Sequence, residues 1–178
     1  PPTLNDIDAR LYFTLLSARK TAYALVQDST KPLARCLAEL LDFAEELQGQ
    51  IGELPTVTEK LDFRSVFQNP ELINPQWPEK VAAGDLTAPV GESHFGRQIA
   101  MYFLFRYFLN LGLEGDVLSA AKMAVVGVLV PTYFGADSWV MHLWSKETEH
   151  SDVNMERYRR LLRTADCLSF PALKSRLV

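Results

Sequence analysis

Cysteine is scarce in this sequence. Cys36 and Cys167 are the only two cysteines in 178 residues, and they lie far apart. No Cys-x-x-Cys pair exists, so the spacings typical of zinc fingers and thiol redox sites are absent. Two isolated cysteines in helical stretches are usually buried and behave as small apolar side chains. Whether these two form a disulfide is left open by their positions.

A surplus of basic residues is also missing. The chain has 18 Lys and Arg against 22 Asp and Glu, which gives a formal net charge of −4. Because binding to phosphates requires Lys and Arg, no nucleic-acid partner is expected. The Gly-rich phosphate-binding patterns, His-Glu-x-x-His and Gly-x-Ser-x-Gly are absent too. The common dinucleotide-binding, zinc-protease and serine-hydrolase sites are therefore not predicted.

Long uninterrupted apolar runs do not occur either. The most apolar stretch, 117–130, contains Lys122, and its neighbour, 99–111, contains Arg106. Both are shorter than the roughly 20 residues that a membrane-spanning helix needs. They are predicted to be core helices, and no membrane partner is expected. The chain shows no signal-peptide pattern, which makes the cytoplasm the expected compartment.

Helical periodicity is what the sequence does contain. Asp6 is a plausible N-cap for a first amphipathic helix, and Pro32 suits the start of a second, which Gly49 or Gly52 would end. Residues 1–50 are therefore predicted to form a pair of helices. Residues 51–92 contain five prolines and are expected to be an extended crossover, with one short helix near 61–67 and aromatic side chains docked on the helices: Pro55, Pro70, Pro75, Pro78 and Pro89.

Residues 93–178 are predicted to be the core helices. The block around 95–111 is apolar nearly all round, as buried helices are. A second buried helix should start at Gly115 or Asp116 and stop at Pro131. Further helices are expected from Asp137 or Ser138 to about 149, over 153–163, and from Ser169 to 176. We therefore predict an all-α domain over 1–178: one irregular bundle of six or seven helices with a Pro-rich crossover and no significant sheet.

The segment 142–152 contains the strongest candidates for catalytic or metal-binding residues. On one helix, His142, Lys146, Glu149 and His150 would lie near one face. Glu149 and His150 could act as an acid/base pair, or bind a metal with a third partner. The alternative is a solvated helix end, after which Ser151 caps the next helix.

Two other groups admit two interpretations each. The only basic cluster could bind an anion or an acidic partner, or it could be a solvated face opposite Glu156 and Asp166. The aromatic stretch 102–108 could line a pocket or be ordinary core. The cluster consists of Arg157, Arg159, Arg160 and Arg163.

Two stretches resemble a known family. They are Met-Tyr-Phe-Leu-Phe-Arg-Tyr-Phe-Leu at 101–109, followed by Glu-Gly-Asp at 114–116, and Trp-Ser-Lys-Glu-Thr-Glu-His-Ser-Asp-Val-Asn at 144–154. The sequence resembles the C-terminal half of the flagellin lysine-N-methylases, which typically show Ser-Arg-Glu-x-Glu-His-Ser-x-x-Asn at the second stretch. The opening Asp-Ile-Asp-Ala-Arg at 6–10 is more loosely similar to the middle of that family.

The resemblance implies a bacterial cytoplasmic enzyme that methylates flagellin lysines with S-adenosylmethionine and a cysteine-bound iron–sulfur cluster. The family's cluster cysteines lie in its N-terminal half, and neither cysteine of this chain fits that motif. Because the chain also begins at Pro1, it is expected to be the C-terminal part of a longer protein. Alone it would carry no cofactor and no methylase activity. Its expected partners are flagellin, or another protein substrate, and the missing N-terminal half.

The resemblance and the placement on one helix face together suggest site residues. Glu149 and His150 are the candidate catalytic residues, and no metal ligands are assigned. The candidates for substrate binding are His142, Ser151, Tyr102 and Arg106. The competing hypothesis is a non-catalytic interaction or scaffold module. It is motivated by the absence of a complete catalytic constellation and by Trp77, which is expected to be exposed in the crossover.

Overall fold

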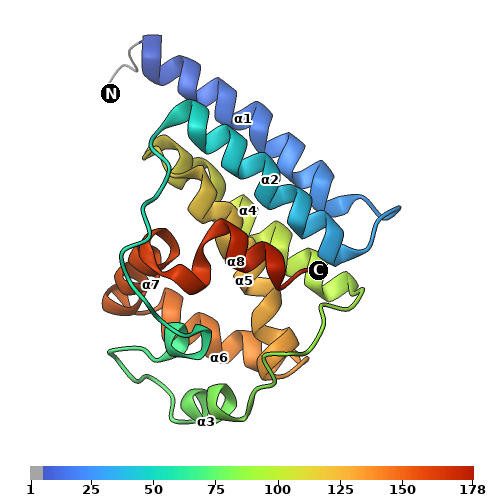
Figure 1. Ribbon diagram of the computed structural model, residues 1–178, viewed down its shortest axis with the longest axis vertical. Coiled ribbons are helices and arrows are strands. Elements are labelled where there is room, and N and C mark those ends of the chain that lie inside the picture. Colours follow the sequence, from blue (N-terminus) through green and yellow to red (C-terminus); the bar gives the residue numbers. More distant parts are fainter. Residues whose placement is uncertain (1–5) are drawn as a thin grey trace.

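The computed structural model describes residues 6–178, with side chains from residue 9 onward, and it is all-α (Figure 1). Within this part the sole β feature is an isolated parallel bridge between Glu59 and Ala165. The predicted all-α class without a sheet is confirmed for residues 6–178, which form eight α-helices rather than six or seven. The elements are α1 (Asp6–Gln27), α2 (Leu33–Ile51), the 3-10 helix η1 (Phe63–Phe67), α3 (Gln76–Ala83), α4 (His94–Leu113), α5 (Val117–Phe134), α6 (Ser138–Glu149), α7 (Asp152–Thr164), the 3-10 helix η2 (Asp166–Leu168) and α8 (Phe170–Ser175).

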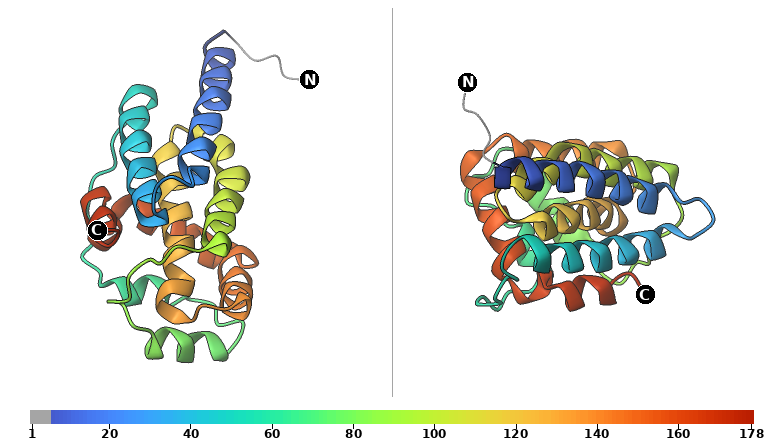
Figure 2. Two further views of the ribbon diagram at one scale, coloured as in Figure 1. Left: turned by 90° about the vertical axis from the view of Figure 1, so that its right-hand side faces the viewer. Right: turned by 90° about the horizontal axis from the view of Figure 1, so that it is seen from above.

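Four long helices form the main bundle. In cyclic order α1, α2, α5 and α4 each pack on the next, and α4 packs back on α1 (Figure 2). Gln48 fastens one end of the bundle: its side-chain amide donates to the Gly115 carbonyl at 2.7 Å and accepts from the Leu118 N–H at 3.1 Å. Helices α6 and α7 pack against α5, and α8 packs against α2. The buried apolar side chains form one continuous core.

Helix α5 is the centre of this core. It is apolar enough and long enough to cross a membrane by composition alone, but 94% of it is buried inside the protein. Contrary to the prediction, α5 does not stop at Pro131 but continues to Phe134. A proline removes one helical hydrogen bond, and burial of the Tyr133 and Phe134 side chains just beyond it offsets that loss. Gly135, with φ of +137°, ends the helix.

The Pro-rich crossover runs along the side of the bundle from the end of α2 to α3 at the far end (Figure 1). Its aromatic side chains dock as predicted, and the expected short helix is η1. Trp77 is not exposed, contrary to the expectation, because it is only 1% accessible and its indole N–H donates to the Phe67 carbonyl at 3.0 Å. The helix missing from the prediction is α3. Pro78 lies in its first turn, where a missing N–H costs no helical hydrogen bond.

Short polar side chains begin most helices. Asp116, Asp137, Ser151 and Ser169 each accept a hydrogen bond from the backbone N–H three residues later, which confirms these predicted caps. Ser93 does the same for α4. The helix starts were thus encoded locally.

The helix ends use distant side chains instead. Arg97 donates to the carbonyls of residues 26, 28 and 31, at and after the end of α1. Arg64 binds the end of α3, and Arg157 binds the carbonyls of residues 65 and 66 in η1. Lys122, in the second turn of α5, donates to the Leu162 carbonyl near the end of α7 at 2.7 Å. Each of these cations donates to carbonyls at or just after a helix end, and each joins two elements.

Candidate functional site

The candidate site lies where the end of α6 meets the middle of α4. Helix α6 buries Val140, Leu143 and Trp144 on the side that faces the core. This orientation turns the Glu149 side chain toward α4 and leaves it only 5% exposed. A carboxylate is rarely buried unless it is paired, so its partners define the site.

Four side chains surround the Glu149 carboxylate. The Tyr102 hydroxyl donates to it at 3.1 Å, and the Tyr107 hydroxyl makes a short hydrogen bond to it. The Ser145 hydroxyl, one helical turn earlier on α6, donates at 3.0 Å. The Arg106 Nε lies 3.1 Å away and forms an ion pair, while more than half of this side chain remains exposed. The carboxylate is therefore a shared acceptor for α4 and α6.

This cluster keeps its tyrosines protonated. Burial, followed by the hydrogen bond to Glu149, raises the pKa of Tyr107. Burial and then the Glu149 charge raise the pKa of Tyr102 as well. Burial raises the pKa of Tyr158, behind Trp144, well above its ordinary value. The Tyr102 and Tyr107 phenols are consequently hydrogen-bond donors to Glu149 at neutral pH and not proton acceptors.

A groove of about 400 Å³ opens beside this cluster, between α4 and α6. Its walls are largely aromatic and apolar, and they include Phe95, Tyr102, Met141 and Trp144. Glu149 lies on it and is the only carboxylate that lines it; no Lys or Arg is among the lining residues. An aromatic groove with one carboxylate favours a cation, because ring faces and a carboxylate both attract positive charge.

The structure brings together four of the six predicted site residues. Tyr102 and Arg106 contact Glu149, and His142 lines the same groove, stacked on Trp139 with ring centroids 5.2 Å apart. His150 is the exposed C-cap of α6 and does not line the groove. In the described part of the chain no hydrogen bond joins His150 to Glu149, so the two do not form a coupled acid/base pair here.

Ser151 lies apart from the groove. It is buried, caps α7, and donates to the Glu71 carboxylate of the crossover. The solvated-end interpretation of 142–152 was correct for this cap, but it missed that the carboxylates on either side of Thr148 are both buried. Glu147 is fully buried and accepts hydrogen bonds from the backbone N–H groups of Ile73 and Asn74.

Asn154, which ends the motif at 144–154 but was not among the predicted site residues, completes this second contact. Its amide group exchanges hydrogen bonds with the Glu71 backbone at 3.0 and 2.8 Å and donates to the Glu147 carbonyl at 2.6 Å. Thus Glu147, Ser151 and Asn154 hold the crossover, while Glu149 and Ser145 form the cluster with α4. Five residues of the motif at 145–154 therefore make structural contacts, three with the crossover and two in the cluster with α4.

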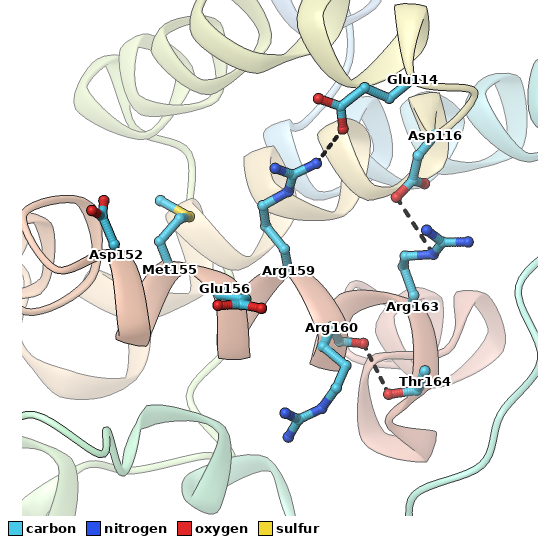
Figure 3. A pocket seen from close by; sticks show the side chains of 9 residues that line it. All are labelled: Glu114, Asp116, Asp152, Met155, Glu156, Arg159, Arg160, Arg163 and Thr164. Carbon is cyan, nitrogen blue, oxygen red and sulfur yellow. Dashed lines mark hydrogen bonds and ion pairs between the residues drawn. The ribbon is translucent and has the colours of Figure 1, made fainter.

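The basic cluster on α7 lines a separate cavity of about 600 Å³ (Figure 3). Arg159 pairs with Glu114, Arg163 lies 3.8 Å from Asp116, and Arg160 lies 3.4 Å from Glu59. Arg157 binds backbone carbonyls instead. The acidic partners differ from the expected Glu156 and Asp166. Because each of these arginines already has a partner, the cavity offers no surplus of positive charge to an anion.

The two cysteines do not fit an iron–sulfur cluster. Such clusters are held by about four thiolates, and this chain has two. The Cys36 Sγ is buried against the carbonyl of Asp28 at 3.4 Å, and burial raises the pKa of the half-buried Cys167 to about 11. Both are free thiols. Among the described residues no group of three or more His, Cys, Asp or Glu side chains could hold a metal ion.

Comparisons with known proteins add no family or fold to this description. No protein-family model matches the chain, and no curated protein or solved structure is significantly similar to it.

Proposed function

We propose that this chain is the substrate-binding helical domain of an enzyme resembling the flagellin lysine-N-methylases, and that the α4–α6 groove receives a lysine side chain of the protein substrate. The observation that carries the proposal is the Glu149 carboxylate, which lies on an aromatic groove without a lining Lys or Arg. A lysine stem can lie along the rings while its ammonium group reaches the carboxylate.

The cluster around Glu149 supports this role. Tyr102, Tyr107 and Ser145 hold the carboxylate in place, so an incoming ammonium group would meet an acceptor that is already oriented. Arg106 is the one cationic partner, and it is largely exposed and can swing into solvent. The incoming ammonium group would replace Arg106, whose side chain is half-exposed, so the loss of that ion pair offsets part of the gain, about 0–1 kcal/mol.

The proposal assigns the chemical step elsewhere. In it, S-adenosylmethionine and the iron–sulfur cluster belong to another part of a longer bacterial cytoplasmic parent, and this domain holds flagellin or another protein substrate. His150 is then not needed for proton transfer, since it lies outside the groove. We derive no methyl-transfer step from the residues of this chain.

Peptide titration tests the proposal. A flagellin peptide with one lysine, and the same peptide with norleucine in its place, are titrated into the chain by calorimetry. A charge-assisted hydrogen bond worth about 1.5–3 kcal/mol, less about 0–1 kcal/mol for the displaced Arg106 pair, predicts that the lysine peptide binds at least about twofold more tightly. Glu149→Gln should remove that preference, while Glu156→Gln on the exposed face of α7 should keep it. Equal affinity of both peptides for the unchanged chain would contradict the proposal.

A second candidate is a non-catalytic scaffold module in which the Glu149 cluster only joins α4 to α6. It is favoured by the full set of partners that Glu149 already has. Under this candidate Glu149→Gln lowers stability and leaves flagellin capture unchanged. Capture of flagellin by the unchanged chain, and its loss in Glu149→Gln at a temperature where that variant is folded, decides between the two.

A further inference from the structure

One face of α4 is apolar although it is open to solvent. Four side chains lie on it at a constant spacing of four residues: Met101, Phe105, Leu109 and Leu113. Phe105 is 71% and Leu113 42% exposed, and the other two are half-buried. Side chains four residues apart form a continuous ridge, and helices pack by fitting such ridges into the grooves of a second helix. This α4 ridge, about 18 Å long at about 1.5 Å per residue, therefore has the form of a helix-packing surface.

Lys20 of α1 lies level with the α4 ridge. Helices α1 and α4 pack side by side (Figure 2). They are antiparallel, because Arg97 near the start of α4 binds the Val26 carbonyl near the end of α1. Toward the other end of α4, Gly112 lies against Leu15. The exposed Lys20 comes between these two contacts, which places a cation on the helix beside the ridge.

The exposed charges on these two helices are basic. Besides Lys20 they are Arg10 on α1 and Arg106 on α4. No Asp or Glu occurs in α4 or in residues 9–27 of α1, although the whole chain has a net charge of −4. The carboxylates that adjoin α4, Glu114 and Glu149, are already paired with arginines. Because a basic surface attracts acidic groups, the ridge favours an acidic partner.

Two other occupants of the ridge are less favoured. In a symmetric dimer each copy would present the same ridge, so Lys20 and Arg106 would meet the same cations of the second copy. Sites for anionic membranes typically cluster about four to eight Lys and Arg. This face exposes only Arg10, Lys20 and Arg106. The ridge shape and the charge together indicate an acidic helix of another protein.

We propose that the α4 ridge binds an amphipathic helix of a partner protein, whose apolar side chains interlock with the ridge and whose flanking Asp and Glu meet Lys20 and Arg106. Arg106 can serve both its present partner and the new one, since it is 53% exposed and a guanidinium group has several donors. This proposal does not depend on the lysine-binding groove.

Titration with a synthetic helix tests the proposal. The probe is a fluorescein-labelled peptide of about 18 residues with Leu along one face and Glu elsewhere, followed by fluorescence anisotropy. We expect saturable binding that weakens at high ionic strength, because exposed charges are then screened. The same peptide with Lys in place of Glu, and a scrambled peptide without an apolar face, should each bind at least about tenfold more weakly. The acidic peptide contains no lysine, so the Glu149 groove does not contribute to its binding.

Three variants assign the binding to the ridge. Phe105→Ser removes its most exposed side chain and should weaken the acidic peptide at least about fivefold, as loss of a central apolar contact does. Lys20→Glu reverses the charge beside the ridge and should also weaken it. Val153→Ser removes an exposed apolar side chain of α7 and should leave the affinity unchanged. Far-UV circular dichroism checks that each variant is folded.

Several results would overturn the proposal. They are the absence of saturable binding, equal affinity for the acidic and basic peptides, and full affinity in Phe105→Ser. A dimer of the unchanged chain in sedimentation velocity that Phe105→Ser dissociates would assign the ridge to a second copy instead. Binding to phosphatidylglycerol vesicles that Phe105→Ser abolishes would assign it to a membrane.

Discussion

Lys122 is a buried lysine in the second turn of α5, the most buried helix, and its charge should destabilise the fold at neutral pH. The side chain is 2% exposed, and burial lowers its pKa from the ordinary 10.5 to about 8. At about 1.4 kcal/mol per pKa unit, the buried charge costs the native state about 3 kcal/mol below pH 8. Lys122→Met keeps the shape and removes this cost.

The substitution also removes a useful contact. The Leu162 carbonyl, at the end of α7, receives the Lys122 ammonium group, and its loss should cost about 1–2 kcal/mol. We therefore expect Lys122→Met to raise the free energy of unfolding by about 1–2 kcal/mol at pH 7. Urea denaturation followed by far-UV circular dichroism measures this value.

The pH dependence is the sharper test. The unfolded chain holds the Lys122 proton up to pH 10.5 and the folded chain only up to about pH 8. The unfolded state thus binds more protons between these values, and the stability contribution of this group rises with pH there. The advantage of Lys122→Met should therefore shrink by about 2 kcal/mol between pH 7 and pH 9.5.

Comparison with a matched variant isolates the effect. Burial raises the pKa of Cys167, which lowers stability above pH 9 in every variant, so this term cancels in the difference. The exposed Lys20→Met should show a flat difference across the same pH range. A difference between wild type and Lys122→Met that stays constant from pH 7 to pH 9.5 would refute the claim that the buried charge is costly.

Three further outcomes follow from the same contacts. Asn154→Ala should lower the free energy of unfolding by about 2–4 kcal/mol, since three buried hydrogen bonds are lost, and limited proteolysis should then cut the crossover first. Arg97→Met should cost about 2–3 kcal/mol by urea denaturation, because carbonyls at the end of α1 lose their donor while the packed stem remains. Gly135→Ala should cost at least about 1 kcal/mol by thermal unfolding, since its φ is +137° and a Cβ would lie 2.8 Å from a Val140 methyl; Gly49→Ala, on the open face of α2, should stabilise by about 0.5–1 kcal/mol.

The long helices could be predicted because their information is local. The starts of α5, α6, α7 and α8 depend on a short polar side chain and the N–H groups within three residues of it. Helix α3 could not be found in the same way. It has only eight residues, with Pro75 just before it and Pro78 in its first turn. Its two ends are stabilised by hydrogen bonds with Glu147 and Arg64, which lie elsewhere in the chain. The end of α5 was misplaced for a similar reason, since core packing outweighs Pro131.

The site was predicted only in part. Glu149, Tyr102 and Arg106 were named separately, and the structure joins them across 47 and 43 residues of sequence. Nothing in the periodicity of either helix could show that pairing. Two residues advance a helix by roughly 200°, so Glu147 and Glu149 face opposite sides of α6. The sequence presented them as one charged run, whereas the structure buries each against a different neighbour.

The long basic side chains that bind helix ends have a consequence for how this sequence can vary over time. Arg97 and Arg157 interact with main-chain carbonyls, which every residue type supplies. The positions that accept these hydrogen bonds are therefore free to mutate, provided that the backbone path is kept. Relatives of this chain should retain a basic residue at 157 without any correlated change at its contact positions, whereas residue 97 also forms an ion pair with the Glu92 side chain and can change together with it. Methods that infer contacts from paired substitutions would miss these interactions.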